Sequence, residues 1–252
     1  MAISPIPTRS RSNSSISSTS STAPLPSFEA LAPPRPPTTT EAEETRLVIP
    51  GLNNDVRLLV DAGPGCGGIA WPAGEVLSRY LAYRHEHDPD KLKGRTIIEL
   101  GSGTGLVGIV AGMLESTANI WVTDQPQLLD LMRSNAEINI PGSSNVHVSE
   151  LNWGEDIPEN VPAKEATLVL AADCVYFEPA FPLLVHTLCL LAPLGKEIEI
   201  LFCWKKRRKA DKRFFALLKK HFDQEMVMDD KKGERERYGR DGVSLLRLTR
   251  RR

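Results

Sequence analysis

One stretch near the middle of the chain, residues 95–114, restricts the fold more than any other part of the sequence. It begins as a short β-branched run, continues through Gly101, Gly103 and Gly105, and ends in an apolar segment with helical character. Glycines in such a turn can adopt positive φ, and they let a ligand approach the backbone without a Cβ in the way. The stretch therefore predicts a strand, a ligand-cradling loop and a helix.

The same alternation of strand and helix patterns continues to the end of the chain. Strands are expected over residues 95–100, 119–124, 147–151, 167–173, 197–204 and 243–248, and helices over residues 106–114, 127–138, 181–191 and 211–222. Alternation of this kind implies a mostly parallel sheet with helices on both faces. We therefore expect one α/β domain over residues 46–252.

The first 40 residues differ in kind from the rest, with 10 Ser, 6 Thr and 8 Pro. Such a segment cannot bury enough apolar surface to offset the entropy lost on ordering, so residues 1–45 are predicted to be a disordered tail. A mitochondrial transit peptide is the alternative, because Arg9 and Arg11 precede any acidic residue. No amphipathic helical period supports it, and we expect a cytoplasmic protein.

Composition excludes several classes of protein. The formal net charge of −1 argues against a broad nucleic-acid-binding face. No apolar run approaches the roughly 20 residues that span a bilayer, so no membrane association is expected. Four cysteines show neither a C-x-x-C pair nor a His at metal-ligand spacing, which predicts reduced thiols and no metal site: Cys66, Cys174, Cys189 and Cys203. A monomer is expected.

The spacing of residues around the glycine loop limits the kinds of ligand that the loop can be expected to bind. The third glycine of a dinucleotide fingerprint would fall at Leu106, which disfavours a dehydrogenase. Glu99 precedes the loop and suits a positively charged ligand end. Asp124 ends the next strand, 23 residues past Gly101, where a carboxylate accepts hydrogen bonds from ribose hydroxyls. A helix cap before Pro126 is its alternative role. An acid followed by alternating glycines is typical of methyltransferases that use S-adenosyl-L-methionine.

Four separated motifs, in one order, carry a more specific resemblance. They are GPGCGGIAWPAG at residues 63–74, LGSGTGLVG at 100–108, LNWG at 151–154 and LAADCVYF at 170–177. Together they resemble the seven-β-strand protein-lysine methyltransferases related to methyltransferase-like protein 21. The match is closer still to fungal members that modify a lysine of translation elongation factor 1-alpha. It rests on the strings GCGG-x-x-W-x-AGE, LGSGTGLVG, LVLAADCVY-x-E-x-AFPLL and KKRRKADK-x-FF. The resemblance covers residues 63–250 and implies a Rossmann-like class I methyltransferase fold, with S-adenosyl-L-methionine as cofactor and a protein as substrate.

The resemblance also implies a set of site residues. The cofactor would contact Trp71, Gly101, Ser102, Gly103, Asp124, Trp153 and Ala172. Asp173 and Tyr176, the D-x-x-Y element, would lie where the target lysine arrives. We hypothesise that they orient the amine and help its proton to leave, with a structural cap as the alternative role of Asp173. The two tryptophans could instead be core aromatics.

Two further alternatives stay open at this point. The basic run at residues 205–213 could be a solvated helix start, an RNA-binding or nuclear-localisation patch, or a docking surface for an acidic protein. The chain as a whole could be an RNA or small-molecule methyltransferase, although no N-P-P-[YF] motif is present, or a non-catalytic scaffold that retains the cofactor pocket.

Overall fold

The computed structural model describes residues 25–31, 43–61, 66–142 and 144–252. Its main sheet has seven strands in the order β5-β4-β3-β6-β7-β9-β8. These are β3 (Thr96–Leu100), β4 (Asn119–Asp124), β5 (Val146–Glu150), β6 (Leu168–Ala172), β7 (Glu199–Lys205), β8 (Phe222–Met226) and β9 (Val243–Arg250). The first five strands in this order pair in parallel, whereas β9 is antiparallel to both β7 and β8. The predicted seven-stranded, mostly parallel sheet is confirmed.

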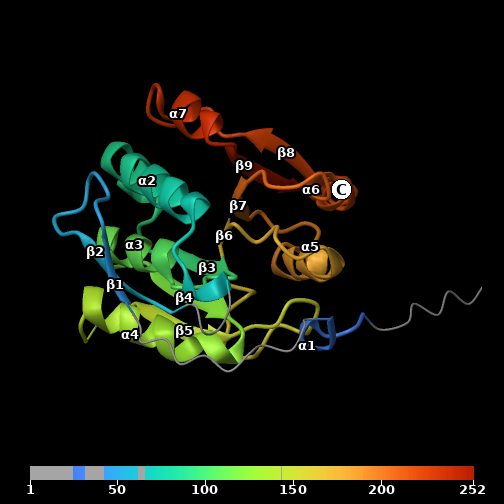
Figure 1. Ribbon diagram of the computed structural model, residues 1–252, viewed down its shortest axis with the longest axis horizontal. Helices are drawn as coiled ribbons and strands as arrows, with labels where there is room; N and C mark the ends of the chain where they lie inside the picture. The colour runs from blue at the N-terminus through green and yellow to red at the C-terminus, as the bar shows by residue number, and fades with distance from the viewer. Residues whose placement is uncertain (1–24, 32–42, 62–65, 143) are drawn as a thin grey trace, which may run out of the picture.

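Helices cover both faces of this sheet (Figure 1). They are α2 (Pro72–His87), α3 (Leu106–Leu114), α4 (Leu129–Asn139), α5 (Phe181–Leu191), α6 (Asp211–Leu218) and α7 (Glu234–Arg240). Successive side chains of a strand point to opposite faces. In β3, Ile98 and Leu100 accordingly pack in the core under α5 and α6, while Ile97 packs in the core under α2 and α3.

A two-stranded hairpin forms an additional layer outside the helices. Its strands, β1 (Glu43–Leu47) and β2 (Val56–Val60), are antiparallel. Leu58 is buried against α3, and the open edge of β2 faces α4. There Asn135 accepts a hydrogen bond from the Leu59 N–H at 2.7 Å and donates to the Leu59 and Thr104 carbonyls at 3.0 Å. One buried amide thus joins the hairpin to the end of the glycine loop.

The helix predicted over residues 211–222 is wrong at its end. Phe214, Leu218 and Phe222 are all fully buried and spaced by four residues, so the apolar period continues past the point where α6 stops. The chain turns after Leu218, and Phe222 enters the same core as the first residue of β8. Apart from the four-residue helix α1 and the short 3-10 turns, five described elements were not predicted: α2, α7, β8, and the hairpin strands β1 and β2. Strand β8 buries only its first residue and so lacks an alternating pattern.

Most of the predicted N-terminal tail lies outside the described residues. Within it the structure describes a four-residue helix, α1 (Phe28–Leu31), and the start of β1 at Glu43, three residues before the predicted domain boundary. Short 3-10 turns precede or follow several helices: η1 (Cys66–Gly68), η2 (Pro89–Lys91), η3 (Pro126–Leu128) and η4 (Glu178–Ala180). Among the described residues, no helix is long and apolar enough to cross a membrane.

Candidate active site

The glycine loop after β3 has a backbone that only glycine supports comfortably. Gly101, Gly103 and Gly105 have φ values of 66°, 59° and 82°, in the left-handed region. A Cβ on Gly101 would lie 2.8 Å from the ring of Trp153, and one on Gly103 would lie 2.5 Å from the carbonyl oxygen of Gly67. The loop is therefore enclosed by η1 on one side and by Trp153 on the other.

Residues at the end of β4 hold this loop in shape. The Ser102 N–H donates to the Thr123 carbonyl at 2.9 Å, and the Ser102 hydroxyl accepts from the Thr123 N–H at 2.9 Å. Oδ2 of Asp124 accepts from the Gly103 N–H at 2.8 Å, and Oδ1 accepts from the Gln125 N–H at 2.7 Å. The structure thus brings together four of the sequence-predicted cofactor residues around two adjacent strand ends.

Glu99 lies beneath the loop and supports its helix. Only 2% of the residue is exposed, and Oε2 accepts a hydrogen bond from the Gly108 N–H at 2.8 Å. Burial raises the pKa of this carboxyl to about 8. The expectation that Glu99 faces a charged ligand end is therefore not met, because its side chain is directed into the first turns of α3.

Aromatic side chains form the walls of the site. Trp71, directly before α2, is 37% exposed, whereas Trp153, after β5, is 7% exposed. The Trp153 ring lies 6.1 Å from the ring of Tyr176, measured between centroids. Ala172 ends β6 beside them and is partly buried. The alternative role of a core aromatic applies in part to Trp153, because its ring packs in the hydrophobic core and also lies against Gly101.

Asp173, directly after β6, links this strand to the end of β7 and to the first turn of α2. Its φ is 58°, the only positive φ outside glycine among the described residues, and its side chain is 3% exposed. Oδ1 accepts from the Lys205 N–H at 2.9 Å and from Nη1 of Arg207 at 2.8 Å. Oδ2 accepts from Nη2 of Arg207 at 3.0 Å and from the Ala73 N–H at 3.3 Å. These four bonds fill the acceptor capacity of a carboxylate, so direct contact with an amine requires one donor to leave.

Arg207 is a site residue that the sequence analysis missed. Its guanidinium forms the two-bond pair with Asp173 and lies 5.0 Å above the Trp71 ring. The residue was grouped with its basic neighbours, because nothing in a run of five cations distinguishes the one that turns inward. Only the pairing of β6 with β7 brings it to Asp173.

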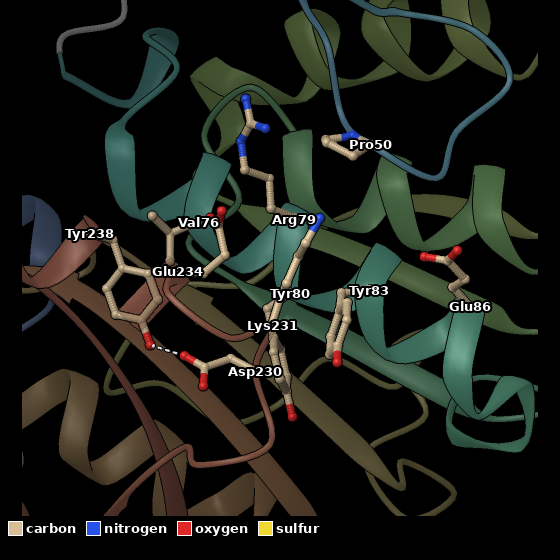
Figure 2. A pocket seen from close by; sticks show the side chains of 10 residues that line it. All are labelled: Pro50, Val76, Arg79, Tyr80, Tyr83, Glu86, Asp230, Lys231, Glu234 and Tyr238. Atoms are coloured by element: carbon tan, nitrogen blue, oxygen red, sulfur yellow. Dashed lines mark hydrogen bonds between the residues drawn. The ribbon is translucent and has the colours of Figure 1, made fainter. Parts of the chain in front are cut away.

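An open groove of about 570 Å³, a volume that includes space open to solvent, is lined in part by residues of α2 (Figure 2). Its lining includes Tyr80, Tyr83 and Tyr238, and none of the sequence-predicted site residues. The Tyr238 hydroxyl donates to Asp230 at 2.8 Å and the Tyr80 hydroxyl donates to Asp229 at 3.1 Å. The hydroxyls of Tyr80 and Tyr238 are thus engaged within the protein, and because none of the sequence-predicted site residues lines the groove, we do not take it as the candidate site.

The described part of the chain contains no cluster of three His, Cys, Asp or Glu side chains that could hold a metal ion. Cys174 and Cys203 are free thiols buried in the core, and burial raises the pKa of each well above its ordinary value. The side chain of Cys66 is outside the described set.

The sequence profile of the lysine methyltransferase family matches residues 52–221, more than half of the chain. The chain belongs to the lysine methyltransferase family. Protein-lysine N-methyltransferase EFM6 of Saccharomyces cerevisiae (strain ATCC 204508 / S288c) is 38% identical to it over 217 residues, covering 77% of this chain and 86% of that relative. Protein N-lysine methyltransferase METTL21A of Danio rerio is 39% identical over 181 residues, covering 71% and 79% respectively.

A third relative is EEF1A lysine methyltransferase 3 of Mus musculus, which is 34% identical over 166 residues, covering 66% of this chain and 68% of the relative. These matches confirm the predicted class I fold and the predicted activity, which is S-adenosyl-L-methionine-dependent N-methylation of protein lysine. The site fits this cofactor: the glycine loop lacks Cβ atoms, and the Asp124 carboxylate lies at the loop, bonded to the Gly103 N–H, where an acceptor for ribose hydroxyls is expected.

Proposed function

We propose that this lysine methyltransferase modifies a lysine of translation elongation factor 1-alpha. The name of one relative, EEF1A lysine methyltransferase 3 of Mus musculus, supports this target. The observation that carries the proposal is the continuity of the site: the glycine loop, Asp124 and Trp153 adjoin a mouth that contains Tyr176 and the Arg207–Asp173 pair.

We further propose how the chain holds its two substrates. Asp124 would accept hydrogen bonds from the ribose, the backbone of residues 101–103 would lie against the nucleoside, and Trp71, Trp153 and Ala172 would line the remaining walls. When bound, the cofactor would supply an electrophilic methyl group to a neutral amine, with a neutral thioether as the leaving group. The residues of the mouth therefore have to align the amine with that methyl group.

The target lysine has to arrive without its proton, because a free lysine has a pKa of about 10.4 and an ammonium has no lone pair for attack. Tyr176, whose ring lies next to Trp153, supplies a hydroxyl that orients the amine. Asp173 fixes the shape and charge of the mouth through Arg207, Lys205 and Ala73. Both residues thus serve the transfer, Tyr176 by contact and Asp173 by position.

The proposed target also bears on the setting of the enzyme. An elongation factor works where translation takes place, which supports a cytoplasmic location. We also propose a monomer that acts on a protein without direct nucleic-acid contact. The proposed methyltransferase domain, predicted over residues 46–252, begins with β1 at Glu43, and the residues before it form the proposed tail.

A transfer assay tests the target. Full-length enzyme is incubated with methyl-labelled cofactor and elongation factor 1-alpha purified from cells that lack the enzyme, with Gly103→Ala as the inactive control. We expect label in the elongation factor that is lost when its target lysine, located by peptide mapping, is replaced by arginine. Label in another protein of a whole extract would reject this target, and label in RNA alone would favour the RNA methyltransferase alternative.

A further inference from the structure

Positive charge is concentrated in residues 205–213, which we call the basic loop. The segment holds seven Lys or Arg residues and one acid, Asp211, giving a net charge of +6 in a chain whose net charge is −1. The remainder of the chain therefore carries −7. Such an asymmetric distribution produces a local positive potential that the overall charge conceals.

The backbone of the basic loop is fixed at several points. Asp211 is 3% exposed, and its Oδ2 accepts from the N–H groups of Arg207 and Arg208 at 3.0 and 3.2 Å. The Lys206 N–H donates to the Gly242 carbonyl at 2.8 Å, and the Arg207 side chain is held by Asp173. A loop held in this way displays its outward side chains without a large ordering cost on binding.

The outward side chains lie beside the mouth of the site. Lys206, Arg208, Lys209 and Lys212 are exposed, at the carboxyl end of β7. The residues that flank them are directly bonded to Asp173, Lys205 through its N–H and Arg207 through its guanidinium. Four exposed cations thus lie on the segment that is bonded to Asp173, on one side of the proposed mouth.

The basic loop lacks the features of a nucleic-acid surface. Proteins that bind single strands combine positive charge with aromatic rings on which bases stack. Residues 205–213 contain no aromatic residue. Of the aromatics that flank them in sequence, Phe214 is fully buried, and Trp204 and Phe215 pack against each other with centroids 4.4 Å apart. The Trp71 ring is near the segment, but the Arg207 guanidinium lies over it. The segment offers charge alone, which suits carboxylates on a protein.

We propose that the basic loop docks an acidic surface segment of the protein substrate next to the target lysine. The proposal rests on the lysine methyltransferase function but not on the identity of the target. A lysine surrounded by other cations is repelled by the loop, whereas one with acidic neighbours is attracted, so the loop selects among lysines by their surroundings. Because these charges are exposed, docking weakens as salt rises.

The test removes three outward charges in the full-length chain. Lys206→Gln, Arg208→Gln and Lys209→Gln are combined, and the matched control combines Lys219→Gln, Lys220→Gln and Lys232→Gln, three exposed cations elsewhere on the chain. At low salt we expect the loop variant to raise KM for the labelled protein about tenfold with kcat unchanged, while the control matches the wild type. Added salt should raise the wild-type KM toward that of the loop variant.

A second readout does not depend on activity. A fluorescent twelve-residue peptide of Glu and Ser should bind the wild type and the control, and lose at least fivefold in affinity with the loop variant. Loop and control variants that behave alike in both assays would overturn the proposal, as would a single-stranded RNA twelve-mer that binds the loop more tightly than the peptide. If elongation factor 1-alpha is not methylated, only the target assignment fails, because the peptide assay still decides the docking surface.

Discussion

At the scale of single residues, the guanidinium of Arg207 combines a charge pair with an aromatic contact. It makes two hydrogen bonds to the Asp173 carboxylate and lies over the Trp71 ring. Asp173 in turn holds the first turn of α2 and the end of β7. A carboxylate with so little exposure requires a positive partner, because an unpaired buried charge is strongly unfavourable. Arg207 therefore stabilises the chain and also shapes the mouth of the site.

Replacing Arg207 by Gln should lower kcat at least tenfold, since the walls around the amine lose their fixed positions. It should also lower the free energy of unfolding by about 2 kcal/mol, because the partner charge remains buried. Arg207→Lys, which keeps the charge but not the two-bond geometry, should recover most of the stability and only part of kcat. Kinetics and urea unfolding measure both effects, with Arg240→Gln as the exposed control. Equal kcat for Arg207→Gln and Arg240→Gln would remove Arg207 from the site.

The raised pKa of Glu99 predicts a pH-dependent stability. The carboxyl keeps its proton up to about pH 8 in the folded chain but only up to its ordinary value of 4.5 when unfolded. Between these values the folded state binds more protons, so the free energy of unfolding falls as pH rises. Glu99→Gln, which does not titrate, should gain stability relative to the wild type between about pH 5 and pH 8. Urea unfolding at both pH values tests this, and a difference that stays constant would contradict the pKa assignment.

At the scale of elements, the hairpin β1–β2 is connected through α4 to the glycine loop of the site. Two asparagines of α4, one turn apart, bond to the edge of β2. Asn139 reaches only the Arg57 backbone there, whereas Asn135 also reaches the Thr104 carbonyl in the glycine loop. Through Asn135 the outer layer restrains the loop from the side opposite β4.

The two asparagines give a matched pair of variants. Asn135→Ala leaves buried backbone groups of β2 and of the glycine loop without partners, and should lower the free energy of unfolding by about 2–3 kcal/mol. It should also weaken binding of S-adenosyl-L-methionine severalfold by calorimetry. Asn139→Ala should cost less stability and leave cofactor affinity unchanged. Equal cofactor affinities for the two variants would show that the hairpin does not restrain the loop.

Sequence patterns predicted many of the elements whose burial follows a simple period, but not all of them: the buried positions of α2 have helical spacing, and this helix was not predicted. The strand–glycine–helix unit at residues 96–114 was identified because its apolar positions and its glycines are consecutive. The hairpin and β8 were not identified. For β8 the reason is that it is an edge strand with one buried residue, so its sequence shows no alternating pattern. Among site residues, the glycines and Asp124 have a fixed spacing, whereas Arg207 acquires its role only when β6 and β7 pair.

At the scale of the whole molecule, the cofactor site is assembled from distant parts of the chain. The glycine loop contacts η1, the end of β4 and Trp153, and α4 holds it from outside. A ligand that binds this assembly stabilises the folded state as a whole, because the unfolded chain has no such site.

Cofactor binding should therefore raise the Tm of the protein. At a ligand concentration of about 100 times Kd, the gain is about 2.7 kcal/mol, which corresponds to a shift of roughly 5–10 °C for a domain of this size. Gly103→Ala should abolish the shift, because its Cβ would meet the Gly67 carbonyl. Gly142→Ala has a similar positive φ but open space around the Cβ, and should keep it. Thermal melts with and without the cofactor test this prediction. An unchanged Tm in the wild type would exclude the glycine loop as the cofactor site.

The antiparallel pairing of β9 has a practical consequence for handling the enzyme. Val243 pairs with Lys205 at the end of the sheet that carries the glycine loop, and Arg250 pairs with Phe222, so the strand leads the last residues away from that end. The Arg251 N–H is bonded to the His221 carbonyl there. A purification tag, fluorophore or surface tether attached at residue 252 would leave the approach clear for a bulky folded target.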